Sequence, residues 1–139
     1  MINKASKGFT LIEVMVVVVI LSILAVFIVP KIMSKPEQAR KTQARQNIRI
    51  LETSLNMYKL DNFQYPSTDQ GLESLVAKPS GTPEPKNYSQ DGYIERLPKD
   101  PWGNQYHYLS PGTKGKIDIY SLGPDGVSSD DDIGNWNLE

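Results

Sequence analysis

The first pattern in the chain is a continuous apolar run near its beginning. Residues 9–29 form a stretch of about 21 positions with a single charged side chain, Glu13. At about 1.5 Å of rise per residue, a helix of this length crosses the hydrocarbon core of a bilayer. A carboxylate inside such a span costs about 2.5–3.5 kcal/mol unless it has a partner. The pattern predicts a transmembrane helix in which Glu13 has a functional role.

A polar segment with a narrow apolar stripe follows. Within residues 31–62 the apolar positions recur at helical spacing, and they are Ile48, Leu51, Leu55 and Tyr58, with Ala44 and Met57 close to the same side. We therefore expect one long helix from about Thr10 to Asn62, about 80 Å long if it is continuous. Its first half would lie in lipid and its second half on a globular head. Pro30 and Pro36 are the positions at which it would bend.

A short helix and a loop follow the long helix. Residues 68–76 predict a helix with Thr68 or Asp69 as its N-cap. Its expected buried face consists of Leu72, Leu75 and Val76. Residues 77–92 are rich in Pro, Ser, Gly and Asn, so they predict a loop.

The last third of the chain contains the strands. Residues 106–109 and 117–120 alternate with period 2 on either side of a Pro-Gly turn, which predicts an antiparallel β-hairpin. Its apolar face would pack on the helical stripe, giving an α+β fold with a small sheet on one long helix. Trp102 and Trp136 are expected to be packing anchors that hold the neighbouring loops to this sheet.

Composition narrows the chemistry. The 139 residues include 15 Lys and Arg, 16 Asp and Glu, one His and no Cys, for a net charge of −1. Disulfides, thiol catalysis and zinc–thiolate sites are therefore excluded, and no basic face for nucleic acid is indicated. His107 is expected to be a half-exposed sheet residue. A small head without disulfides favours another source of stability, such as a metal or neighbouring subunits.

Two lysines, Lys4 and Lys7, precede the apolar run, which opens with the sequence Gly8-Phe9-Thr10-Leu11-Ile12-Glu13-Val14. This sequence resembles the class III signal motif of type IV pilins and pseudopilins. The resemblance implies that a prepilin peptidase cuts after Gly8 and methylates the new N-terminus at Phe9. An ordinary secretory signal peptide and a plain signal anchor are the alternatives, and neither explains Glu13.

Cleavage after Gly8 would create a free amine at Phe9. The ammonium group of one subunit, carried into the bilayer, is a natural counter-ion for Glu13 of the next subunit. Each charge would then offset the desolvation of the other.

An acidic loop lies near the end of the chain, bent by two glycines and a proline. Its carboxylates are Asp125, Asp130, Asp131 and Asp132. Calcium takes six to eight oxygen ligands from carboxylates and carbonyls on flexible loops, which this composition supplies. The spacing differs from the EF-hand template. A solvated acidic turn is the alternative.

The chain is also similar to the major pseudopilins of type II secretion systems, the general secretion pathway protein G family. The similarity covers nearly the whole mature chain and is carried by residues 70–75, 98–103, 121–126 and 132–136. It implies a calcium site in the acidic loop. The implied ligands are the carbonyls of Leu122 and Val127 and the side chains of Asp125, Asp131 and Asp132, with the register among residues 130–132 left open.

The resemblance implies a domain order and a function. Residues 1–8 would be a cleaved leader, 9–29 the transmembrane and filament-core helix, and 30–139 a periplasmic head. The protein would be a non-enzymatic filament subunit of the inner membrane that drives export of folded proteins. Its partners would be other copies of itself, minor pseudopilins, inner-membrane assembly proteins and the prepilin peptidase.

Three alternatives stay open. Two belong to the same class, a type IV pilin and a minor pseudopilin. The third is a membrane-anchored periplasmic module that binds calcium or hydrolyses a substrate, for which Glu95 and Asp100 are the available carboxylates.

Overall fold

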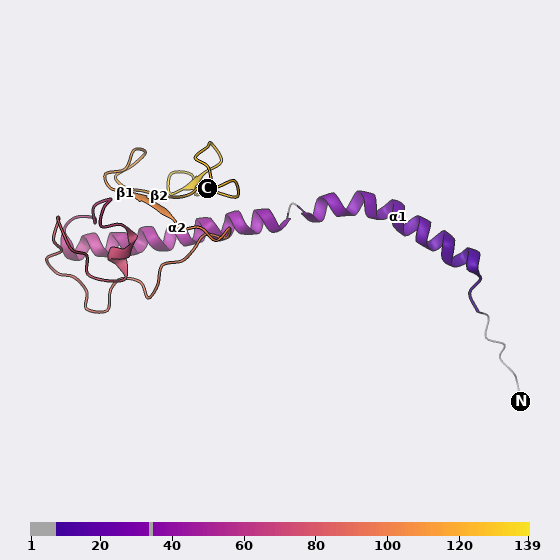
Figure 1. Cartoon of the computed structure of the whole chain (residues 1–139), viewed down its shortest axis with the longest axis horizontal. Helices are drawn as coiled ribbons and strands as arrows, with labels where there is room; N and C mark the ends of the chain where they lie inside the picture. The colour runs from indigo at the N-terminus through magenta and orange to yellow at the C-terminus, as the bar shows by residue number, and fades with distance from the viewer. Residues whose placement is uncertain (1–7, 34) are drawn as a thin grey trace, which may run out of the picture. The chain divides into compact units, whose positions relative to one another are not determined.

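The computed structural model describes residues 8–33 and 35–139, with the side chains of 28–35 outside the description (Figure 1). Most of the predicted leader, residues 1–8, therefore lies outside the described residues. The chain divides into two units, and the second begins at Ala39. The elements in order are α1 (Leu11–Met33), α2 (Lys35–Asn62), the 3-10 helix η1 (Leu72–Leu75), β1 (His107–Leu109), β2 (Asp118–Ser121) and β3 (Ile133–Gly134).

Helix α1 contains most of the apolar run. It begins at Leu11, close to the predicted start, and the apolar side chains described along it are exposed in the single chain. Within the described part of the chain, no helix meets the length and hydropathy required to span a membrane. The predicted span, 9–29, extends into the positions whose side chains are not described, so it stays a prediction.

Helix α2 ends at Asn62, as predicted. The expected single helix over 10–62 is described as two segments, and Ser34 between them lies outside the described residues. Pro30 falls within α1. Pro36 is in the first turn of α2, where a missing N–H leaves no helical hydrogen bond unmade.

The predicted apolar stripe of α2 forms the core of the C-terminal unit. Its members are almost completely buried, as the sequence predicted for Ala44, Ile48, Leu51, Leu55 and Tyr58. The prediction for Met57 was wrong, because its side chain is 54% exposed. Met57 is nine residues from Ile48, which places it about 180° around the helix.

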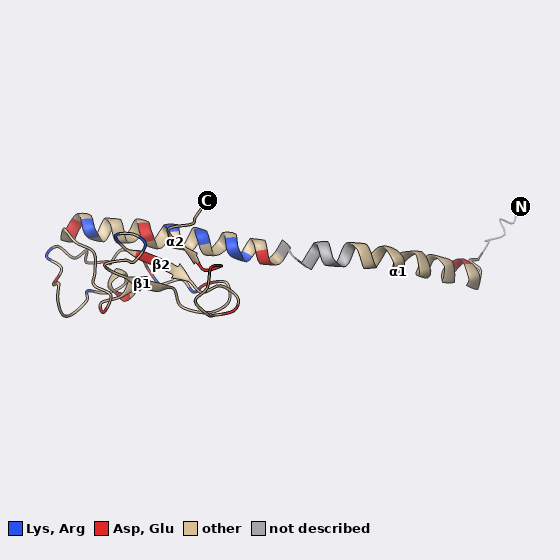
Figure 2. Cartoon of the chain, turned by 90° about the horizontal axis from the view of Figure 1, so that it is seen from above, with Lys and Arg blue, Asp and Glu red and all other residues tan. Residues whose placement is uncertain are grey.

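The outer surface of α2 carries charge. Figure 2 shows Lys and Arg recurring along this helix, with acidic residues between them. Arg49 Nη2 donates a hydrogen bond to the Leu138 carbonyl at 2.8 Å. Arg49 of α2 therefore also contacts the C-terminal end of the chain.

The short helix after α2 differs from the prediction. It is a single 3-10 turn whose N-cap is Gly71, at φ +64°, with no capping side chain. Glycine at this backbone angle interrupts a helix that starts at Thr68 or Asp69. Because a 3-10 helix has three residues per turn, Leu72 and Leu75 share the buried face, whereas Val76 follows the helix and is 39% exposed. Both the predicted N-cap and the predicted burial of Val76 were wrong.

The predicted hairpin is confirmed within one residue at its ends. Strand β1 pairs antiparallel with β2, with Tyr108 opposite Ile119, and β2 pairs antiparallel with β3, with Ser121 opposite Ile133. Sequence analysis missed β3, because two residues are too few to show a period of 2. The three strands form one sheet in the order β1-β2-β3.

The hairpin loop is organised by a buried acid. Asp118 is 1% exposed, and its carboxylate accepts hydrogen bonds from the backbone N–H groups of Thr113, Lys114 and Gly115 at 2.6 to 3.2 Å and from the Thr113 hydroxyl at 2.8 Å. Burial alone raises the pKa of Asp118, but the Lys114, Thr113 and Gly115 donors outweigh burial and hold that pKa below its ordinary value.

Replacing Leu55 with Ala tests the helical stripe. Leu55 is fully buried, so the change removes apolar contacts and leaves a cavity. We expect the free energy of unfolding to fall by about 2–5 kcal/mol, measured by urea denaturation of the full chain in detergent micelles with tryptophan fluorescence. Leu60→Ala, at a site 77% exposed, is the matched control. It should change stability by about 0.5 kcal/mol or less, and equal losses for the two variants would contradict the described core.

Replacing Asp118 with Asn tests the carboxylate of the hairpin loop. Because its folded pKa is lowered, Asp118 stabilises the fold above the pKa of the unfolded chain, and this contribution disappears as pH falls through the folded pKa. We expect the variant to be less stable than the parent by about 1–3 kcal/mol near neutral pH, with the gap closing as pH falls through the folded pKa of Asp118. Urea denaturation at a series of pH values measures it. Asp69→Asn, an exposed site with the same charge change, is the control; a pH-independent gap for Asp118→Asn would contradict the assignment.

Candidate functional site

The first candidate site is the beginning of α1. Glu13 Oε2 accepts hydrogen bonds from the Thr10 backbone N–H at 2.8 Å and from the Thr10 hydroxyl at 3.0 Å. The Glu13 N–H donates in turn to the Thr10 hydroxyl oxygen at 3.4 Å. This reciprocal pair is a capping box, which satisfies backbone N–H groups that a helix start leaves free.

Sequence analysis gave Glu13 only an intermolecular role and missed the capping box. The signal was available, because Thr at one position and Glu three residues later, just before an apolar run, is typical of this motif. Glu13 therefore has a local structural role in the single chain. Phe9, immediately before the box, is 88% exposed.

The second candidate site is the aspartate loop, residues 122–132. Gly123 and Gly126 have φ of +71° and +67°, so the two glycines predicted to bend this loop do so. Asp125 is exposed, and its Oδ1 accepts a hydrogen bond from the Val127 N–H at 3.2 Å. The Asp125 side chain therefore makes a hydrogen bond to the backbone within the first half of the loop.

The last two aspartates fold onto the serines before them. Asp132 is 7% exposed, and its carboxylate accepts from the Ser129 N–H at 3.2 Å and from the Ser128 hydroxyl at 3.4 Å. Asp131 is exposed and accepts from the Ser129 hydroxyl. This hydroxyl, helped by the charge of Lys41, holds the pKa of Asp131 below its ordinary value.

The donor set of this loop suits a hard cation, because carboxylate and carbonyl oxygens are what calcium binds. Among the described residues, however, no three Asp, Glu, His or Cys side chains are grouped closely enough to hold a metal ion. The structure therefore does not bring Asp125, Asp131 and Asp132 together. Each instead accepts hydrogen bonds from its own part of the loop, which limits the repulsion among the three charges.

A buried acid lies at the base of the aspartate loop. Asp100 is 5% exposed; its Oδ1 accepts from the Trp102 N–H at 3.1 Å and the Asn104 N–H at 2.7 Å, and its Oδ2 accepts from the Ser121 hydroxyl at 2.7 Å. Glu95, its suggested partner in a hydrolytic site, is exposed. An acid with both oxygens engaged in this way is a structural group, and nothing in the arrangement favours acid–base catalysis.

The two tryptophans pack near the loops, as predicted. The Trp136 ring lies 5.7 Å from the ring of Tyr120 on β2, and Lys114 Nζ lies 4.4 Å from the Trp136 ring centroid. Trp102 packs against the core cluster. Trp136, shortly after the end of the aspartate loop, therefore makes an aromatic contact with Tyr120 of the sheet.

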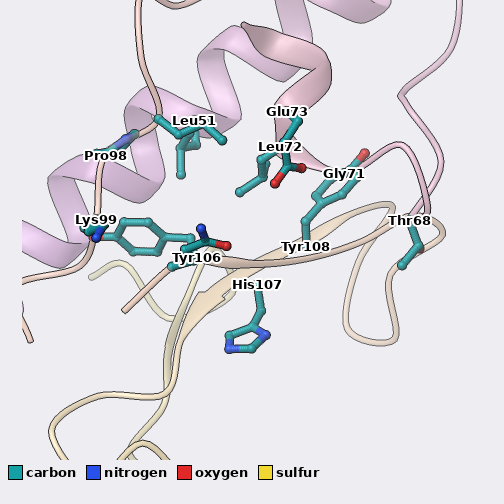
Figure 3. Close-up of a pocket in the computed structure, with 12 residues that line it drawn as sticks. Leu51, Thr68, Gly71, Leu72, Glu73, Pro98, Lys99, Tyr106, His107 and Tyr108 are labelled. Carbon is teal, nitrogen blue, oxygen red and sulfur yellow. The ribbon is translucent and has the colours of Figure 1, made fainter. Parts of the chain in front are cut away.

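A pocket of about 250 Å³ lies between α2, η1 and β1 (Figure 3). Tyr106 and Tyr108 lie on the side of the strand that faces α2, whereas His107 lies on the opposite side. The His107 ring is stacked 5.1 Å from the ring of Tyr120, and the residue is exposed, as expected of a sheet residue. The pocket contains no described nucleophile paired with a base.

Comparisons with known proteins agree with these features. The family model described as "Type II secretion system (T2SS), protein G" matches residues 31–136, and that described as "Prokaryotic N-terminal methylation motif" matches residues 3–29. The type II secretion system core protein G of Pseudomonas aeruginosa is 59% identical over 97% of this chain and 98% of its own length. That of Vibrio cholerae is 60% identical, with 98% and 95% covered.

A solved structure gives the same result. The crystal structure of the major pseudopilin from the type 2 secretion system of enterohaemorrhagic Escherichia coli is similar with a TM-score of 0.70 and 53% identity. The similarity covers 75% of this chain and 92% of that one.

A methylation motif ahead of an apolar helix, together with a second helix packed on a small antiparallel sheet, defines a pilin-like protein. Within this class, the chain belongs to the type II secretion system protein G family. This is a family of structural pseudopilins, and the predicted resemblance is confirmed.

Proposed function

We propose that this chain is the major structural subunit of a type II secretion pseudopilus. It polymerises into a periplasmic filament whose growth drives folded proteins through an outer-membrane channel. The observation that carries this proposal is the protein G family match over residues 31–136 behind a methylation motif at 3–29. Minor pseudopilins and inner-membrane assembly proteins are the expected partners, and the role is structural rather than enzymatic. The family match does not favour a type IV pilin, a minor pseudopilin or a calcium-binding module.

The subunit is made as a precursor in the inner membrane. A prepilin peptidase removes residues 1–8, methylates Phe9 and leaves 9–29 in the membrane, with 30–139 as the periplasmic head. Lys4 and Lys7 favour a cytoplasmic leader. Among the described residues, a Cβ atom added to Gly8 would meet nothing within 4 Å, so these residues do not crowd that position.

In the filament, the ammonium group at Phe9 of one subunit pairs with Glu13 of its neighbour. An unpaired carboxylate in a membrane-like filament core is costly, and only a neighbour at the right axial offset removes that cost. The pair would set the register of an open helical assembly, in which each subunit presents two different surfaces. Capping by Thr10 satisfies Glu13 locally before assembly, when no neighbour is present.

We also propose that the aspartate loop binds calcium through the carbonyls of Leu122 and Val127 and the carboxylates of Asp125, Asp131 and Asp132. The oxygen-only donor set and the sequence resemblance support this. Binding would require Asp125 to exchange its hydrogen bond with Val127 for the cation. Bound calcium would supply the positive charge that permits the three carboxylates to approach one another.

Two substitutions of Glu13 separate its capping role from its charge. Gln at this position keeps a capping box, whereas Ala removes both the box and the charge. We expect both variants to be processed to N-methylated Phe9, as checked by intact mass, and both to fail to form filaments, as checked by electron microscopy of cells that assemble the wild type. Assembly of Glu13→Gln at wild-type levels would show that the intermolecular charge pair is not required. A wild-type chain that retains Met1 would overturn the proposed processing.

Removing the loop carboxylates tests the calcium site. Calcium at about 100 times its Kd should stabilise the wild-type chain by about 2.7 kcal/mol and raise its melting temperature by several degrees. The double variant Asp125→Ala with Asp132→Ala should lose this rise. Because Asp132 also accepts the Ser129 N–H, the variant should melt lower even without calcium, so the difference between the two conditions is the readout.

Asp91→Ala, at an exposed site outside the loop, is the matched control and should keep the full calcium response. Magnesium in place of calcium tests selectivity. A wild-type melting temperature that does not respond to calcium would contradict the site.

A further inference from the structure

The chain contains two pairs in which an aspartate is followed directly by glycine, Asp91–Gly92 and Asp125–Gly126. In such a pair the backbone nitrogen of the glycine can attack the carboxyl carbon of the aspartate and close a five-membered ring, because glycine has no Cβ atom to hinder the approach. Both aspartates are exposed. Since the reacting residues are the same in the two pairs, the fold decides whether they differ in reactivity.

The fold holds the first pair in place. The Gly92 N–H donates a hydrogen bond to the Ser89 carbonyl at 3.0 Å. A Cβ atom added to Gly92 would lie 2.9 Å from the carbonyl oxygens of both Leu75 and Val76, so the backbone is closely packed at this point. The Gly92 nitrogen therefore cannot turn toward the Asp91 side chain until this segment opens locally.

The second pair lies in open space within the aspartate loop. Asp125 and Gly126 are both exposed, and a Cβ atom added to Gly126 would meet nothing within 4 Å. Among the described residues, no hydrogen bond holds the Gly126 N–H in the way that Ser89 holds that of Gly92. The Gly126 nitrogen can therefore approach the Asp125 side chain without any prior opening of the fold.

The Asp125 side chain is also folded back along the backbone that follows it. Its Oδ1 accepts a hydrogen bond from the Val127 N–H at 3.2 Å, which keeps the carboxyl group beside the Gly126 peptide. An intramolecular reaction gains much of its rate from such proximity. The loop thus brings the two reacting groups together and leaves them room to close a ring.

We propose that Asp125 is a site of spontaneous isomerisation to isoaspartate, through a succinimide ring formed with Gly126, and that the fold protects Asp91 from the same reaction. In the first step the Gly126 nitrogen bonds to Cγ of the protonated Asp125 carboxyl, and the carboxyl OH and the amide hydrogen leave as water.

The second step is hydrolysis of the ring. Water adds to one of the two ring carbonyl carbons, whose bond to nitrogen then breaks. Opening at Cγ returns aspartate, whereas opening at the backbone carbonyl carbon gives isoaspartate, in which the chain continues through the former side chain. The two steps release and consume one water molecule each, and they need no oxidant, reductant or cofactor.

Isomerisation would change the shape of the loop but not its charge. It adds one methylene group to the backbone at residue 125 and moves the carboxylate that accepts the Val127 N–H. Because the site is exposed and lies outside the buried core cluster, the C-terminal unit should stay folded. This inference goes beyond the proposed filament role, and it does not depend on calcium.

Labelling with heavy oxygen tests the reaction. The full chain in detergent micelles is incubated near neutral pH, with a chelator, in water that carries heavy oxygen, and is then digested in ordinary water. Each ring opening leaves one heavy oxygen at the reacting residue, which peptide mass spectrometry locates, and chromatography separates isoaspartyl from aspartyl peptides. We expect labelling and isoaspartate to accumulate about tenfold faster at Asp125 than at Asp91, because the Gly92 hydrogen bond and packing must open first. In urea the two sites should react at similar rates.

Two glycine substitutions isolate the ring closure. Gly126→Ala places a Cβ atom beside the attacking nitrogen, so it should lose most of the product at Asp125 and leave Asp91 unchanged. Gly81→Ala is the matched control, because Gly81 also has a positive φ, +81°, and open space around it. It should react as the wild type does. Asp125→Glu, which would need a larger ring, is a second variant that keeps Gly126 and should form no product at residue 125.

The remaining outcomes would overturn the inference. A folded chain that gains neither heavy oxygen nor isoaspartate at Asp125 would show that the site does not react. Equal rates at Asp125 and Asp91 in the folded chain, or the same unequal ratio in urea, would show that the fold does not select the site. Reaction of Gly126→Ala at the wild-type rate would exclude ring closure through the Gly126 nitrogen.

Discussion

The packing of one apolar stripe of α2 against the β-sheet is the interaction on which the C-terminal unit depends. Ile48, Leu51 and Leu55 from the helix and Ile119 from β2 are fully buried in one cluster. Strands of two to four residues cannot form an independently stable sheet, so the helix supplies the surface that holds them in place. The position of Ser121 at the end of β2, and with it the start of the aspartate loop, follows from this packing.

Buried carboxylates organise the connections between these short strands. The chain has no cysteine, and two of its turns are instead built around Asp118 and Asp100. Each acid collects backbone N–H groups that would otherwise be unsatisfied in a loop. Asp118 serves only its own hairpin loop, whereas Asp100 links a turn supported by α2 to a strand end. Through Ser121, whose oxygen also accepts the Gly123 N–H, Asp100 is therefore connected to the start of the aspartate loop.

Helix α1 is subject to a different requirement. Its start is satisfied within the chain by the Thr10 and Glu13 capping box, but its apolar side chains remain exposed in the single chain. A contiguous apolar surface of this kind needs an apolar environment or a partner. In the proposed filament, lipid before assembly and neighbouring helices after assembly would supply that environment in turn.

The sequence by itself determined the features that depend on local pattern. The spacing of Ile48, Leu51 and Leu55 predicted the buried face of α2, the period-2 stretches predicted the hairpin, and the Gly8 to Glu13 motif predicted the class of protein. Each of these signals is either a repeating pattern or a motif contained within a few consecutive residues.

Tertiary structure decided the features that depend on contacts between distant segments. Strand β3 is two residues long, and its pairing with β2 gives it its identity. The hydrogen bond from Ser121 to Asp100 joins residues 21 positions apart in the chain, so no local pattern predicts it. The exposure of Val76 depends on the 3-10 geometry that Gly71 initiates. A local pattern shows which side chains seek burial, but only the folded chain shows which polar groups meet, because hydrogen bonds form between particular atoms at particular distances.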